Sequence, residues 1–219
     1  MKKFFEMGGV IAGGLLVAFG VGAIVIGFTG RSEVRSNIQR EAIVGSADMT
    51  PSAIKSEAAK AGLKNVDLPT CSVANEPITT GDEAKCFASY MRIHTLEATK
   101  GYTYSQMGRY QALPTAPKSE LAVGGGTDNP IYAAIDAKTA QPVANGLREL
   151  WVTETALTTA LNTSFFAERV ALFSIVMGFA LLLSGIGFLV LAYLGVLKVR
   201  HADAEAKAKG KGGAPVPAA

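Results

Sequence analysis

Residues 168–201 read ERVALFSIVMGFALLLSGIGFLVLAYLGVLKVRH. Between Arg169 and Lys198 no side chain carries a charge, over about 28 residues, and roughly 20 apolar residues are enough to cross a bilayer as a helix. The sequence therefore predicts a transmembrane helix over residues 170–196, with length to spare for tilt.

A second uncharged run covers residues 7–28. An apolar run close to the N-terminus can instead be a cleaved signal peptide, whose apolar part is about 7–15 residues long and precedes a cleavage site of small residues. This run is longer than that and continues into VGAIVIGFTG with only an imperfect site. We therefore expect an uncleaved transmembrane helix over residues 7–28.

Basic residues flank both runs on their outer sides. Lys2 and Lys3 precede the first run, and five Lys and Arg side chains follow the second. Cytoplasmic flanks of membrane helices carry such an excess of Lys and Arg. We expect both termini, residues 1–6 and 197–219, to be cytoplasmic, the second as a disordered tail rich in Ala, Lys, Gly and Pro, and residues 29–169 to be exported.

The basic character of the chain, with a net charge of +3 and a pI near 8.8, arises at these ends. Within the exported region, acidic and basic side chains are nearly balanced. The charge therefore indicates a chain in contact with the lipid bilayer and gives no support to nucleic-acid binding.

Cys71 and Cys86 are the two cysteines of the chain, and both lie in the expected exported region. An even number of cysteines at loop spacing in an oxidising compartment indicates a disulfide. The alternative is a pair of unpaired buried thiols.

Helix signals dominate the exported region. The first span is expected to continue as a helix up to Gly45, and Thr50, Pro51 and Gly62 mark the start and stop of a short helix. A long helix is predicted from Thr80 or Asp82 through residue 113, ended or kinked at Gly101, with Phe87, Tyr90, Met91 and His94 on one face. A last helix begins near Val143 and enters the membrane. The expected fold is mainly α, a helical-bundle-like domain between two spans, without a sheet.

Small residues recur along both apolar helices. One seven-residue repeat runs from the exported region into the second span through Leu150, Leu157, Ser164, Ala171, Gly178, Gly185 and Ala192. Close backbone approach through small residues joins helices in lipid. We predict helix packing through Gly9, Gly13, Gly20, Gly27, Ser174, Gly178 and Gly185, although glycine is also common in membrane helices generally. The same faces would serve an internal hairpin or a dimer.

No catalytic, cofactor or metal site is expected. His94 and Glu97 share a helix face, but carboxylate-bridged metal bundles need further pairs of this kind, and a core or interfacial histidine is the preferred interpretation. The other histidine, His201, lies in the opposite compartment by this topology. A possible partner surface comprises Tyr102, Tyr104, Arg109, Tyr110 and Trp151, for which core packing is the alternative.

Two stretches, REAIVGSADMTPSAI after the first span and LRELWVTETALTTALNTSFFAERVALFSIVMGFALL before and into the second, resemble small two-span membrane proteins of actinobacteria. Some of these carry the label of aromatic-ring-opening dioxygenase. A non-heme iron oxygenase needs two histidines and a carboxylate around an open metal position, whereas the two histidines here are expected on opposite sides of a membrane. The resemblance therefore implies the two-span layout and no catalytic residue.

Two functions fit these observations. One is a membrane-anchored accessory or scaffold protein without catalytic activity, whose exported domain binds another membrane or envelope protein, or a second copy of itself. The other is a ligand-sensing ectodomain that signals through a partner membrane protein. An exposed apolar patch on a solid core favours the first, and a pocket with convergent polar groups favours the second.

Overall fold

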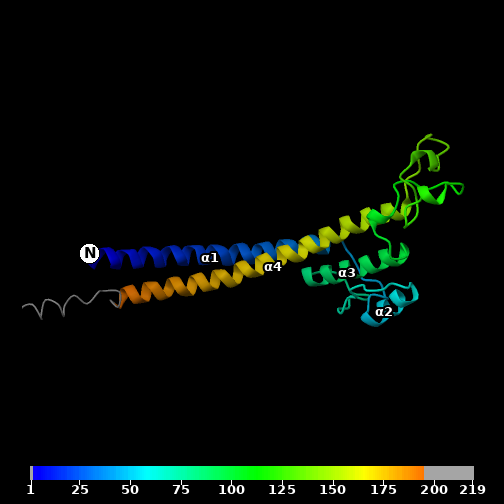
Figure 1. The fold of residues 1–219 in the computed structure, drawn as a ribbon. Helices are drawn as coiled ribbons and strands as arrows, with labels where there is room; N and C mark the ends of the chain where they lie inside the picture. The colour runs from blue at the N-terminus through cyan, green and yellow to red at the C-terminus, as the bar shows by residue number, and fades with distance from the viewer. Residues whose placement is uncertain (1, 195–219) are drawn as a thin grey trace, which may run out of the picture. The chain divides into compact units, whose positions relative to one another are not determined.

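The computed structural model describes residues 2–194, with side chains from residue 7 onward. Four α-helices form this part of the chain, labelled in Figure 1: α1 (Lys2–Arg40), α2 (Pro51–Lys60), α3 (Gly81–Ala98) and α4 (Gly146–Tyr193). Between residues 2 and 194 the chain has isolated β-bridges and no strand. The prediction of a mainly α fold is confirmed, while the predicted disordered tail lies outside the described residues.

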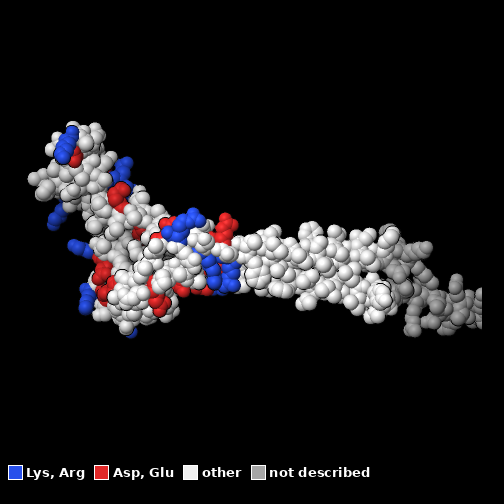
Figure 2. All heavy atoms as spheres, turned by 180° about the vertical axis from the view of Figure 1, so that it is seen from behind, with Lys and Arg blue, Asp and Glu red and all other residues white. Residues whose placement is uncertain are grey.

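The described chain divides into two compact units. The apolar unit contains the described residues of Met1–Phe28 and Leu172–Ala219, and the polar unit is Thr29–Ala171. In Figure 2, the charged side chains gather over the polar unit, and the visible face of the apolar unit carries none.

Helices α1 and α4 are long and apolar enough to cross a membrane. Within the most apolar 18-residue window of each helix, only 11% of α1 and 22% of α4 is buried. A core helix of a water-soluble protein would be mostly buried, because water penalises exposed apolar surface. The exposed apolar side chains of both helices are thus suited to contact with lipid.

The core of the polar unit forms around α3, which buries Tyr90 and Ile93 almost completely. Helix α2 begins where the sequence predicts: the Thr50 hydroxyl accepts a hydrogen bond from the Ala53 amide, and Pro51 is the first helical residue. A disulfide joins Cys71 and Cys86, so that this prediction is also confirmed. It fixes the loop before α3 to the second turn of that helix.

Two predicted helix ends are wrong. Helix α1 ends at Arg40 instead of Gly45, because Ala42 takes a left-handed backbone conformation and Gly45 pairs with the 73–77 loop. A Cβ on Gly45 would overlap the Val73 carbonyl, so the glycine serves this close approach and not a helix end.

Helix α3 ends at Ala98, and residues 102–113 are not α-helical. Gly101, at φ +83°, turns the chain out of the helix. The amide and carbonyl of Tyr110 then exchange hydrogen bonds with those of Thr127, both 2.9 Å long. Pairing with a distant segment therefore replaces the helical bonds that local propensity favoured.

Residues 102–145 form loops that lead into α4. The Asn145 side chain donates to the Gly108 carbonyl at 2.9 Å and accepts from the Leu147 amide at 3.2 Å. One buried side chain thereby holds the loops and satisfies an amide at the start of α4. The helix starts at Gly146, three residues after the predicted position.

The seven-residue repeat on α4 forms one of two rows of buried positions along this helix, which together make up its buried seam. Ala171, Gly178, Gly185 and Ala192 are buried, and Leu157 and Ser164 are half-buried, as the repeat predicts. Leu150 is 37% exposed, so its assignment is wrong, and its neighbour Trp151 is buried instead. A second set of buried positions, which the predicted repeat does not include, comprises Glu154, Leu161, Glu168 and Ile175.

Candidate functional site

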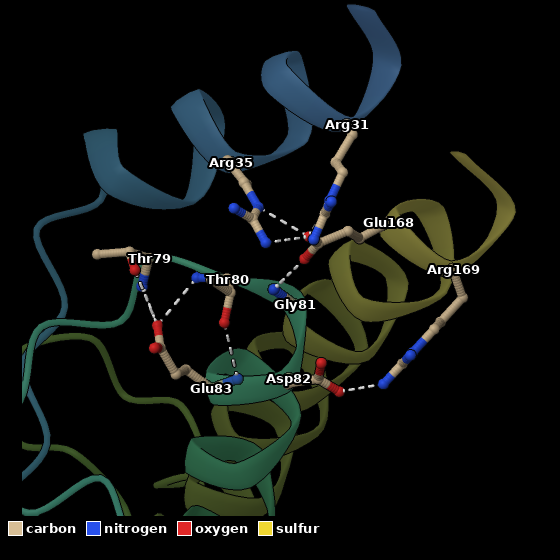
Figure 3. A network of polar contacts seen from close by, with 9 residues as sticks. All are labelled: Arg31, Arg35, Thr79, Thr80, Gly81, Asp82, Glu83, Glu168 and Arg169. Atoms are coloured by element: carbon tan, nitrogen blue, oxygen red, sulfur yellow. Dashed lines mark hydrogen bonds and ion pairs between the residues drawn. The ribbon is translucent and has the colours of Figure 1, made fainter. Parts of the chain in front are cut away.

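The densest group of ionic contacts in the polar unit surrounds Glu168 of α4 (Figure 3). Arg31 and Arg35 lie four residues apart on α1 and therefore project from the same helix face. Their guanidinium groups lie 2.9 and 2.7 Å from Oε1 of Glu168. The side chains of Arg31 and Arg35 are each about one-third exposed, whereas Glu168 is buried.

The other oxygen of Glu168 binds the start of α3. The Gly81 amide donates to Oε2 of Glu168 at 2.6 Å. The amides of Thr79 and Thr80 donate to Glu83 at 2.7 and 3.0 Å, and the Thr80 hydroxyl accepts from the Glu83 amide, which completes a capping box. Two carboxylates thus accept hydrogen bonds from three successive amides at the N-terminus of α3, where the helix dipole is positive.

Glycine is required at position 81 for this contact. A Cβ there would lie 2.8 Å from the Cα of Phe165 and 2.9 Å from Oε2 of Glu168. On the outer side of the group, Arg169 pairs with Asp82. The start of α3, the last turns of α1 and the middle of α4 are therefore held together at one point, which we call the Glu168 cluster: Arg31, Arg35, Thr79, Thr80, Gly81, Asp82, Glu83, Glu168 and Arg169.

Two carboxyl groups of the cluster, those of Glu168 and Glu83, favour their charged form. Burial alone would raise the pKa of Glu168, but hydrogen bonds from Arg31, the Gly81 amide and Arg35 outweigh burial and lower this pKa below its usual value. Burial would also raise the pKa of Glu83, but hydrogen bonds from Thr79 and Thr80 outweigh burial and lower this pKa. Glu168 and Glu83 therefore contribute fixed negative charge near neutral pH.

Sequence reasoning did not identify this cluster. A usable signal exists, because Glu168 occupies a position seven residues after Leu161 and seven before Ile175, where an apolar residue is expected. A charged residue in an apolar register indicates a partner of opposite charge.

In the apolar unit, glycines bring the two helices into backbone contact. A Cβ on Gly20 would lie 2.6 Å from the Leu182 nitrogen and 2.8 Å from the Gly178 carbonyl oxygen. A Cβ on Gly13 would lie 2.9 Å from the Gly185 carbonyl oxygen. Gly178 and Gly185 show the reciprocal contacts, so these four predicted packing residues lie in the helix interface.

The remaining predicted packing residues are less closely defined. Gly27 is buried, and Gly9 and Ser174 are half-buried. In contrast, a Cβ on Gly14 or Gly22 would meet nothing within 4 Å. The glycines of α1 therefore differ by helix face. Those on one face pack against α4, and those on the other make no close contact and need no explanation beyond the general frequency of glycine in membrane helices.

The five residues of the possible partner surface do not form one patch. Arg109 is exposed and pairs with Asp128 at 3.2 Å, while Tyr102 and Tyr110 are half-buried. Trp151 is only 3% exposed, and its indole N–H donates to the Tyr102 carbonyl at 2.9 Å. Its main contribution is therefore to the core.

Tyr104 and Trp151 nevertheless share an open groove on α4. The groove has a volume of about 540 Å³ and is lined by Tyr104, Trp151, Val152, Thr155, Ala156 and Thr159. The Arg148 guanidinium lies 3.9 Å above the Tyr104 ring and fixes this exposed aromatic side chain at the rim. The lining is mostly apolar and includes the hydroxyl groups of Thr155 and Thr159.

A smaller recess lies between α3 and α4. It has a volume of about 180 Å³ and is lined by Ala88, Ser89, Arg92, Glu154, Thr158 and Asn162. Glu154 is only 3% exposed and accepts a hydrogen bond from the Thr155 hydroxyl at 3.3 Å. The recess therefore presents a carboxylate and a guanidinium to the same small volume.

No family model, curated protein or solved structure matches the chain.

Proposed function

We propose that the chain is a two-span membrane protein with both termini in the cytoplasm, and that its exported domain acts as an accessory or scaffold module for another cell-envelope protein. The lengths and exposed apolar faces of α1 and α4 support the two spans. The Cys71–Cys86 disulfide supports an oxidising, extracytoplasmic location for residues 29–169.

The observation that carries the scaffold function is the groove over Trp151. Its lining is mostly apolar and includes the core residue Trp151, while the lining residues Val152 and Tyr104 remain 47% and 42% exposed. Exposed apolar surface of this kind, bordered by polar side chains, is typical of protein-binding sites. The occupant that fits is an apolar or aromatic segment of an envelope protein.

Site-specific crosslinking in native membranes tests this function. A photoreactive residue at Thr159, in the groove, is expected to capture one defined envelope protein, and the same residue at Thr153, which does not line the groove, is not. Thr155→Arg would place a charge in the groove and abolish capture. Thr153→Arg is the matched control, because residues two apart on a helix point to opposite sides and Thr153 does not line the groove.

Equal capture from positions 159 and 153, or equal loss in the two arginine variants, would contradict the scaffold function.

The recess between α3 and α4 favours ligand sensing as a second function. A small zwitterion would match the carboxylate of Glu154 and the guanidinium of Arg92. Sensing predicts that free amino acids raise the melting temperature of the full chain in micelles, and that Glu154→Gln removes the effect. Unchanged melting of the wild-type chain across the amino acids would contradict it.

A further inference from the structure

Three side chains with metal-binding groups meet in the polar unit, apart from the Glu168 cluster. Asp48 lies in the loop before α2, Glu57 in α2 and His94 in α3. One donor atom from each lies within 4.8 Å of the other two, and all three residues are half-buried. Donors from three separate segments thus converge on one small volume.

Two of these donors have no hydrogen-bond partner. Nε2 of His94 and Oε2 of Glu57 each expose less than 1 Å² of surface and accept or donate no hydrogen bond. Buried polar atoms are nearly always paired, and an unpaired one costs about 1–3 kcal/mol. The nearest acidic atom to the imidazole nitrogen is Oδ2 of Asp48 at 3.6 Å, which is too long for a hydrogen bond.

The same separation suits a shared metal ion. Zinc binds imidazole nitrogen and carboxylate oxygen at about 2.0–2.2 Å in a tetrahedral arrangement, which places neighbouring donors about 3.4 Å apart. The 3.6 Å between His94 and Asp48 is close to this value. Because all three donor atoms lie within 4.8 Å of one another, small side-chain movements would bring them to the spacing of a tetrahedral metal site.

The surroundings of the three donors also suit a metal. The Ser46 hydroxyl donates to Oδ1 of Asp48, which leaves Oδ2 of that carboxylate facing His94. Oε2 of Glu97 lies 3.9 Å from Nδ1 of His94, on the opposite side of the ring. A carboxylate near the second ring nitrogen is usual for metal-bound histidine, because it orients the imidazole and raises its basicity.

We propose that Asp48, Glu57 and His94 bind a divalent transition-metal ion, for which Zn²⁺ is the probe. The two carboxylates balance the charge of the ion, and the imidazole favours zinc and its neighbours over Mg²⁺ or Ca²⁺. The bound ion connects α2, α3 and the loop between α1 and α2, in addition to the Cys71–Cys86 disulfide. This site is independent of the proposed partner groove.

Calorimetric titration of the full chain with Zn²⁺ tests the site. The chain is purified in micelles with a histidine-free tag and stripped with a chelator. The wild-type chain is expected to bind one ion, and Glu57→Gln and His94→Gln to weaken binding at least tenfold. Glu76→Gln, at an exposed carboxylate outside the group, and His201→Asn, at the other histidine, are expected to bind as the wild type does.

Melting curves provide a second readout. Zn²⁺ is expected to raise the melting temperature of the wild-type chain, since a ligand that binds the folded state stabilises it, and to leave that of Glu57→Gln unchanged. Glu57 is on the half-buried face of α2, so this variant keeps the test valid if His94→Gln fails to fold. Wild-type binding no tighter than that of Glu57→Gln, or loss of binding in His201→Asn, would overturn the proposal.

Discussion

The apolar and polar units both join α1 to α4, and they do so by opposite means. In the apolar unit, Gly20 and Gly178 have no side chain and allow the backbone of one helix to contact the backbone of the other. In the polar unit, Arg31 and Arg35 reach across to Glu168 with long charged side chains. The same two helices thus pack closely through glycines in one unit and through charged side chains in the other.

The difference between the two contacts matches the solvents that we propose for the two units, lipid for the apolar unit and water for the polar unit. In lipid, apolar side chains gain nothing by leaving the solvent, so helices associate through close van der Waals packing. In water, a charged group can stay partly hydrated while it pairs, as the one-third exposed arginines do. Each unit should therefore fail under a different change.

The largest expected effect is that of Gly20→Leu. The added side chain would meet the backbone of Leu182 and Gly178, which cannot move aside without separating the helices. We expect a loss of about 3 kcal/mol in the free energy of unfolding in micelles, at the upper end for overpacking. Gly22→Leu is the matched control, since position 22 is open, and equal stability of the two variants would contradict the packing role.

Glu168→Gln is expected to cost about 2 kcal/mol, because it weakens charge-assisted hydrogen bonds to Arg31 and Arg35. Faster hydrogen exchange should appear at the start of α3, where Gly81 is bound, and not in the glycine interface of the apolar unit. Glu33→Gln, at an exposed position on α1, is the control. Faster exchange in the glycine interface would show that the two units are not separately stabilised.

A smaller effect is expected from pH. The pKa of Glu168 in the folded chain is lowered from its ordinary 4.5, so the folded state binds fewer protons than the unfolded one. Its contribution is complete above about pH 4.5 and is lost as the pH falls through the lowered folded pKa. Glu168→Gln should therefore lose less stability on acidification than the wild-type chain, and parallel acid curves would contradict the assignment.

Several features of the fold were predictable because they depend on local chemistry. Thr50 and Pro51 start α2, and Thr80 caps α3, through bonds made within one helical turn. The long apolar runs of α1 and α4 follow from composition alone. The packing glycines were found because their spacing repeats along the helix.

Other features depend on residues far apart in the chain. The helix predicted through residues 102–113 is replaced by loops because Tyr110 pairs with Thr127. The second half of the α4 seam was missed because Glu154 and Glu168 are charged, and their burial depends on groups brought by other segments.

The sequence by itself determined the mainly α class, the two apolar helices, the cysteine pair and the glycine faces. Each of these follows from a property that a residue shares with neighbours a few positions away or from the composition of one stretch. Only the tertiary structure decided that Glu168 binds two arginines and a helix start, and that Asp48 and Glu57 approach His94. Such contacts are set by how distant segments pack, and that packing leaves no periodic signal in the sequence.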